Sequence, residues 1–114
     1  MADPLPILVL VRDLIFSTRI STTARSAGME IKVIRDPARL ANESGRLLLV
    51  DLNLPGAIEA ASAWRNGTTP VVGFVSHVDA DTASKARSAG IDRVMARSRF
   101  VKILPELLKD RGTD

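Results

Sequence analysis

The 114-residue sequence has no cysteine, no tyrosine, one histidine and one tryptophan. The absence of cysteine excludes a disulfide framework and a thiolate metal site, and a single histidine leaves too few ligands for structural zinc. No apolar run approaches the ~20 residues of a membrane-spanning helix. The N-terminal apolar run is short and follows no basic segment, so it does not predict a signal peptide. We expect a cytoplasmic protein with no membrane contact.

Aromatic residues make up only 4% of the chain, so the aliphatic residues within its 46% hydrophobic content must build the core. Charged residues at 25% are ordinary for a globular protein. The length fits one domain spanning residues 1–114. The formal charge of +3 would suit an acidic partner, although many proteins without one carry as much.

Apolar segments of strand type alternate with segments of helical periodicity along the whole chain. Strands are predicted at residues 6–11, 29–35, 46–50, 70–75 and 91–96. Helices are predicted from Phe16 to Ala27, from the Asp36-Pro37 N-cap pair, over 57–64, over 79–89 and from Phe100 onward. Gly28 and Gly90 stand where the first and fourth helices should end.

This βαβαβαβαβα order predicts a parallel sheet with helices on both faces. Right-handed crossovers leave few topologies, and five strands fit the α/β flavodoxin-like (βα)5 three-layer sandwich with strand order 2-1-3-4-5. Sites in such sheets lie at the carboxyl ends of the strands. Here those ends carry Arg12-Asp13, Asp51, Val75-Ser76-His77 and Arg97-Ser98.

The stretch "LLLVDLNLPG" (47–56), the strand after Pro70 and "ARSAGIDRVMARSRF" (86–100) together resemble the receiver domain of two-component response regulators. The resemblance covers the whole chain, is CheY-like and includes no output domain. It implies a signalling role in a bacterial-type phosphorelay rather than an enzyme. It also implies that Asp51 stands where the family's aspartate accepts a phosphoryl group from a histidine kinase.

The same resemblance implies Mg²⁺ between Asp51 and an acidic pair after the first strand, a Thr or Ser after the fourth strand, and a Lys after the fifth. This sequence departs from each of these. The acidic pair reads Arg12-Asp13, the Thr/Ser position falls on Val75 with Ser76 one residue later, and the Lys position holds Arg97. Ser98 replaces the Pro that usually follows the Lys.

Charge arithmetic gives these departures a consequence. Asp13 and Asp51 supply two negative charges, and Arg12 and Arg97 supply two positive ones if both point inward. A site near neutrality would bind Mg²⁺ weakly or not at all at Asp13 and Asp51. An arginine would then pair with Asp51, even bidentately. We therefore expect a degenerate, pseudo-receiver site without a cofactor. The alternative is a conventional single-domain response regulator that uses Mg²⁺ and is phosphorylated on Asp51.

Basic residues concentrate late in the chain: Lys85, Arg87, Arg93, Arg97, Arg99, Lys102, Lys109 and Arg111. A solvated surface explains them, but so does a docking face for an acidic signalling partner. The fourth helix, fifth strand and fifth helix signal in receivers, which implies partner contacts at Arg93, Arg99 and Lys102. Such a partner could be a histidine kinase or a downstream target. Nucleic acid is not expected, because no aromatic residues interleave with the basic ones. Monomer and homodimer both stay open.

Two other interpretations are weaker. Ser76 and His77 invite a hydrolase, but adjacent strand-end residues point in opposite directions, and Asp79 stands where the next helix needs an N-cap. A small flavodoxin-like cofactor binder would need a phosphate cradle, and the loop "RDLIFST" (12–18) contains no glycine.

Overall fold

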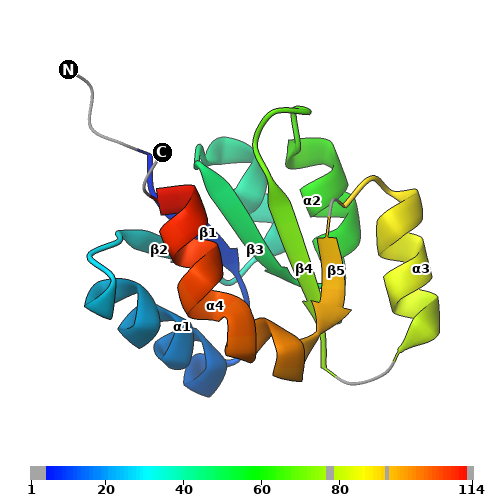
Figure 1. Ribbon diagram of the computed structural model, residues 1–114. Helices are drawn as coiled ribbons and strands as arrows, with labels where there is room; N and C mark the ends of the chain where they lie inside the picture. The colour runs from blue at the N-terminus through cyan, green and yellow to red at the C-terminus, as the bar shows by residue number, and fades with distance from the viewer. Residues whose placement is uncertain (1–4, 77–78, 92, 113–114) are drawn as a thin grey trace.

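The computed structural model of the protein describes residues 5–76, 79–91 and 93–112, the last four by their backbone only. Its elements are β1 (Ile7–Leu10), α1 (Leu14–Ser26), β2 (Ile31–Ile34), the 3-10 helix η1 (Pro37–Asn42), β3 (Leu47–Asp51), α2 (Ala57–Trp64), β4 (Val71–Val75), α3 (Ala80–Ser88), β5 (Arg93–Ala96) and α4 (Arg97–Gly112). Figure 1 shows these elements in place. The predicted alternation of strands and helices is confirmed.

The five strands form one parallel sheet in the order β2-β1-β3-β4-β5, as predicted. Strands β1, β3 and β4 read as continuous apolar runs because helices bury both of their faces. The register sets Val50 beside Gly73 and Asp51 beside Phe74. All strands run in one direction, so their carboxyl ends meet at a single edge.

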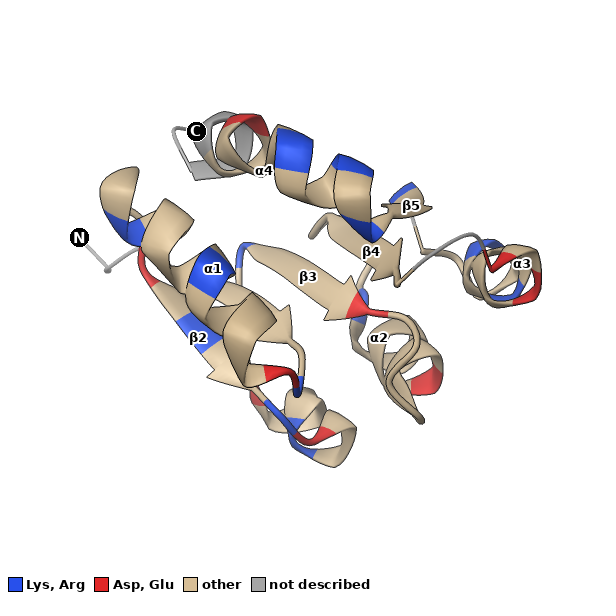
Figure 2. Ribbon diagram, turned by 90° about the horizontal axis from the view of Figure 1, so that it is seen from below, with Lys and Arg blue, Asp and Glu red and all other residues tan. Residues whose placement is uncertain are grey.

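Helices cover the sheet in two groups, which makes three layers. Figure 2 shows α1 and α4 on one side of the sheet and α2 on the other. Alternate strand residues feed two separate cores. Phe16, Ile20, Ala24, Phe100, Leu104 and Leu108 fill the α1/α4 side. Leu40, Ala57, Ala61, Ala86 and Ile91 fill the side of η1, α2 and α3.

Local capping explains where the helices begin and end. The Asp13 carboxylate accepts hydrogen bonds from the backbone N–H groups of Ile15 and Phe16 at the start of α1. Asp79 caps α3 by accepting from the N–H of Thr82, which confirms the predicted N-cap. Gly28 follows α1 with a φ of +73°, a conformation that costs glycine little.

Two predicted helix bounds differ from the structure. The first helix was predicted to end at Ala27, but α1 ends at Ser26, and Ala27 is its exposed C-cap beyond the buried stripe that ends at Ala24. The last helix starts at Arg97 directly after β5, three residues earlier than expected. No proline or glycine separates Ala96 from Phe100, so nothing in the backbone forces a loop there. Arg97 therefore lies in the first turn of a helix.

None of the helices in the described part of the chain is long and apolar enough to cross a membrane.

Candidate functional site

Asp51 is the last residue of β3 and lies at the edge where the strands end. Its place in the alternation, two residues after Leu49, turns its side chain toward the α1/α4 side of the sheet. Only 13% of that side chain is exposed. Its Oδ1 accepts a hydrogen bond from the backbone N–H of Asn53 at 3.0 Å.

Asp13 approaches the same place from the start of α1. Its Oδ1 is occupied by the helix cap, accepting from the N–H groups of Ile15 at 2.9 Å and Phe16 at 3.1 Å. Its Oδ2 remains directed toward the site. The cap therefore holds one of the two carboxylates in position.

Arg97 spans the two carboxylates. One terminal guanidinium nitrogen lies 3.7 Å from Asp51 Oδ2, and the other lies 3.8 Å from Asp13 Oδ2. Both distances exceed a hydrogen bond, so these are ion pairs without direct bonding. The guanidinium is shared between two acids, so it does not form the bidentate pair with Asp51 that the sequence left open.

Aromatic rings hold Arg97 in this position. The guanidinium carbon lies 4.3 Å from the centroid of Phe16 and 5.8 Å from that of Phe74. Phe74 in turn stacks on Phe100 at 4.4 Å, so the chain's three phenylalanines form one cluster beneath the arginine. A cation over an aromatic face is attracted to it. Arg97 and these phenylalanines lie far apart in the sequence, so the sequence did not predict the contact.

Burial raises the pKa of the Asp51 carboxyl. The Asn53 N–H and the Arg97 charge oppose this effect, while the nearby Asp13 charge adds to it. The upward direction persists although an ion pair is present. At 3.7 Å, shared and without a hydrogen bond, Arg97 offsets only part of the desolvation. The negative charge of Asp51 is thus compensated less fully than the charge count from the sequence suggested.

Arg12 does not take part in the site. It is exposed and forms no ion pair with Asp13 or Asp51, all three being described residues. Its backbone carbonyl accepts from the Arg35 guanidinium at 3.2 Å. The sequence left open whether Arg12 points inward, and its side chain turns to solvent. Among the residues that the structure describes, Asp13, Asp51 and Arg97 give the site a formal charge of −1 rather than zero.

At the end of β4, the side chains of Val75 and Ser76 face different parts of the molecule. Val75 packs into the core on the η1/α2/α3 side, away from Asp51. Ser76 instead lines a hollow of about 560 Å³ with Asp13, Phe16 and Arg97. Counting from Pro70 had placed Val75 at the Thr/Ser position, but it is Ser76 that shares a surface with the site. His77 lies outside the described residues.

Asn53 is the residue that the sequence did not single out. Its side-chain oxygen accepts from the N–H of Ser76 at 2.6 Å, and its amide nitrogen donates to Asp79 Oδ2 at 3.2 Å. Its only sequence signal was its place two residues after Asp51, where a side-chain oxygen often accepts the backbone N–H.

The arrangement does not fit a divalent cation. Mg²⁺ requires an octahedron of oxygen ligands. Arg97 faces both carboxylate oxygens that remain directed into the site. Asp13 Oδ1 and Asp51 Oδ1 already accept backbone hydrogen bonds. Among the described residues, no group of three or more acidic or histidine side chains could hold a metal.

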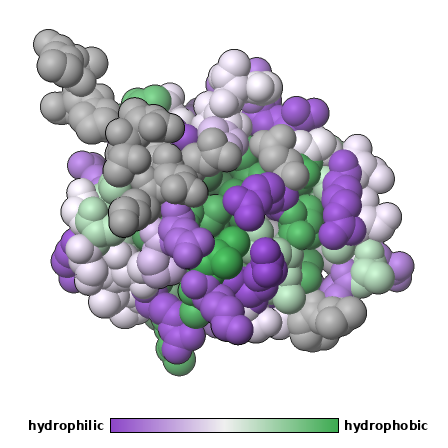
Figure 3. Space-filling model, viewed as in Figure 1, coloured by the Kyte–Doolittle hydropathy of each residue, from purple (hydrophilic) through white to green (hydrophobic). Residues whose placement is uncertain are grey.

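Arg93, Arg99 and Lys102 lie on β5 and α4, and all three are exposed. We call these three residues the basic face. Arg93 and Arg99 line one small hollow of about 150 Å³ with Ile103, Glu106 and Leu107. Figure 3 shows apolar surface among hydrophilic side chains where α4 and β5 lie. Arg97, expected in the same basic run, points into the Asp51 site instead.

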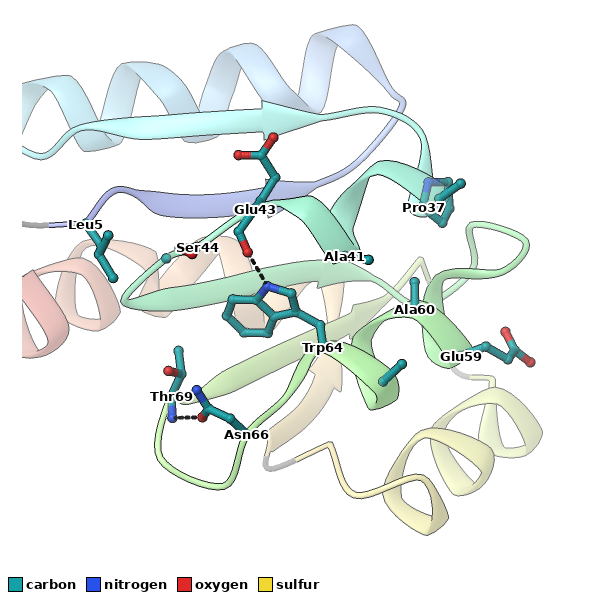
Figure 4. Close-up of a pocket in the computed structure, with 13 residues that line it drawn as sticks. Leu5, Pro37, Ala41, Glu43, Ser44, Glu59, Ala60, Trp64, Asn66 and Thr69 are labelled. Carbon is teal, nitrogen blue, oxygen red and sulfur yellow. Dashed lines mark hydrogen bonds between the residues drawn. The ribbon is translucent and has the colours of Figure 1, made fainter.

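A larger hollow of about 650 Å³ lies between η1 and α2, away from Asp51 (Figure 4). Trp64 lines it and donates its indole N–H to the Glu43 carbonyl at 2.9 Å. Alanines from both helices form much of the wall. It contains no residue of the Asp51 site, so its size does not identify it as the functional centre.

No protein-family model matches the chain, and no curated protein matches it in sequence. Solved structures do match. The BeF3-activated DrrB receiver domain superposes with a TM-score of 0.81 at 18% identity, covering 98% of this chain and 100% of that one. The phosphorylated cyanobacterial phytochrome response regulator RcpA gives a TM-score of 0.78 at 15% identity, covering 97% and 96%.

The protein has the receiver-domain fold. The Mn²⁺-bound response regulator Rcp1 also shares this receiver fold, with a TM-score of 0.77 at 18% identity and 97% of each chain covered. At these identities the likeness is one of fold, because a fold can host unrelated functions. What the receiver fold does in this chain depends on the residues at its Asp51 edge.

Proposed function

We propose that this protein is a receiver-like signalling protein of the two-component type, with a degenerate phosphorylation site, that acts through protein–protein contacts. Arg97 carries the proposal. Its guanidinium, held over Phe16, faces both carboxylates that a metal-dependent phosphorylation site would need. Phosphoryl transfer relies on a metal to neutralise the developing charge. We do not propose an enzymatic activity or a bound cofactor.

Incubation with a small phosphodonor and Mg²⁺, followed by intact mass measurement, tests the degenerate site. We expect no Asp51-dependent gain of a phosphoryl group in the natural chain. The variant Arg12→Asp/Arg97→Lys, which rebuilds the acidic pair and the lysine, should gain one and lose it on Asp51→Asn. A gain by the natural chain that Asp51→Asn abolishes would contradict the proposal.

That outcome would favour the second candidate, a conventional response regulator phosphorylated on Asp51 by a histidine kinase. One observation supports it. Leu14 and Ile15 are 61% and 84% exposed at the start of α1, immediately beside Asp13. Ile15 also lines the hollow that contains Ser76 and Arg97. Exposed aliphatic side chains at the rim of a site suit contact with another protein.

We further propose the basic face as the surface that meets an acidic partner, in the cytoplasm. The face combines three cations with the partly exposed apolar Ile103, and charge complementarity across such a surface steers association. Affinity capture with the charge-reversed variant Arg93→Glu/Arg99→Glu/Lys102→Glu should lose partners that the natural chain retains.

The matched control for this reversal is Arg25→Glu/Arg35→Glu/Arg39→Glu. These three arginines are exposed on other parts of the surface and give the same change in net charge. Loss of the same partners from both variants would indicate a net-charge effect. Retention of every partner by the basic-face variant would show that the face is not used.

A further inference from the structure

Asn53 joins the β3–α2 turn to the start of α3. Its backbone N–H donates to Asp51 Oδ1 at 3.0 Å. Its side chain holds the N–H of Ser76 and the carboxylate of Asp79. We infer that Asn53 is a coupling residue, which transmits a change at the Asp51 carboxylate to the N-terminal end of α3. This goes beyond the proposed function, because the coupling holds whatever the partner.

The hydrogen-bonding partners of the Asn53 amide fix its orientation. Its oxygen faces a backbone N–H donor and its nitrogen faces a carboxylate acceptor. A flipped amide would set two donors against each other and two oxygens against each other. The side chain therefore has one satisfactory orientation, and the Asp51 hydrogen bond holds the backbone that carries it.

The start of α3 is sensitive to this contact. Asp79 accepts from the Thr82 N–H at 3.1 Å and from the Thr82 hydroxyl at 2.7 Å, so the carboxylate that binds Asn53 is also the helix cap. Helix α3 has nine residues, and Ala86 is the one that is buried. Isolated helices of this length are marginal in water, so the cap and the packing of Ala86 decide its order.

A change in α3 has a path to the basic face. Ala86 and Ile91 belong to one buried cluster, and Val94 of β5 packs against it. Val94 follows Arg93 in the same strand. The hydrogen bonds thus join Asp51 to α3, and the packing joins α3 to β5. A demonstrated effect of one site on the other is the physical test of such a path.

Amide hydrogen exchange by NMR measures the coupling. The readout is the protection of the Thr82 and Ala83 amides relative to Ala24 in α1, which corrects for a change in global stability. The variants are Asp51→Ala, Asp51→Asn, Asn53→Ala and Asp51→Ala/Asn53→Ala. Asn66→Ala is the control, because the Asn66 oxygen also accepts backbone N–H groups in a loop, from Thr68 and Thr69.

We expect Asp51→Ala and Asn53→Ala each to lower the protection about fivefold, the effect of losing one helix-cap contact. The double variant should lose no more than either single one. Asp51→Asn keeps an acceptor oxygen and should lower the protection of the Thr82 and Ala83 amides less than twofold. Asn66→Ala should leave that protection unchanged. Should Asn53→Ala not fold, Asn53→Ser replaces it. Unchanged protection in Asp51→Ala, or multiplying losses in the double variant, would overturn the inference.

Discussion

Replacing Arg97 by methionine separates its charge from its packing. Methionine keeps an unbranched chain over Phe16 and removes the guanidinium that faces both acids. The stacked cation contributes about 1 kcal/mol. Two partly exposed ion pairs without hydrogen bonds contribute about 1 kcal/mol together. The free energy of unfolding at pH 7 should fall by about 2 kcal/mol.

Thermal unfolding followed by circular dichroism converts this loss into a temperature. At ~2.1 cal/mol/K per residue, the 114-residue chain has an unfolding entropy of roughly 240 cal/mol/K, so the midpoint should fall by about 8 °C. The pKa of Asp51 is raised above 3.8 by burial, so at pH 3 this carboxyl is largely protonated and its ion pair with Arg97 is lost. The fall should then be smaller than at pH 7, because that ion pair no longer contributes.

The pKa of Asp51 explains why removing Arg97 should destabilise the protein more at pH 7 than at pH 3. Arg97 lowers that pKa against the larger effect of burial, so removing Arg97 raises it further and penalises the ionised carboxylate most above the pKa. Arg99→Met is the matched control, an exposed arginine in the same helical turn, and should shift the midpoint by less than 2 °C. An equal fall at pH 3 and pH 7 would refute the electrostatic part of this reasoning, and no fall at either pH would refute all of it.

Three further predictions concern single positions. Asp51→Asn should raise the denaturant midpoint of unfolding at pH 7, because burial raises the pKa of Asp51 above 3.8 and ionising the carboxyl therefore costs the folded state free energy. The gain should disappear as the pH falls through the raised pKa to 3.8, and a gain that persists below 3.8 would contradict the prediction. Gly73→Ala should lower the free energy of unfolding by about 1–3 kcal/mol, since the added carbon would lie 2.7 Å from Leu52, and an unchanged urea midpoint would refute that overpacking. Trp64→Phe should cost about 1–3 kcal/mol by leaving the part-buried Glu43 carbonyl without its indole donor, and equal stability in urea would show that water replaces it.

The negative formal charge of the Asp51 site changes what the arginine substitutions mean. With Arg12 in solvent, Arg97 is the one cation in the described part of the chain that forms ion pairs with the two acids, and the pKa of Asp51 stays raised. The carboxylate is neither free to gather a metal nor fully neutralised. Because the charge of Asp51 is only partly compensated, an added positive charge nearby or protonation of the carboxyl should change its interactions. That response is what the hydrogen bonds of Asn53 would pass to α3.

The sequence by itself determined the architecture. Strand-type runs without polar interruption, such as residues 47–50, and periodic helices between them leave a parallel sheet as the way to bury every apolar face. Capping residues such as Asp79 could also be predicted from the sequence, because a cap depends on neighbours within three residues. The edge that carries Asp51 followed from strand order alone.

Only the tertiary structure decided which side chains meet at that edge. Arg12 and Arg97 are both arginines at strand ends, yet one faces solvent and the other lies on Phe16, which is 81 positions earlier in the chain. The bridge from Asn53 to Asp79 crosses 26 positions in the same way. Contacts between residues so far apart depend on the packing of whole elements, and local patterns carry no information about them.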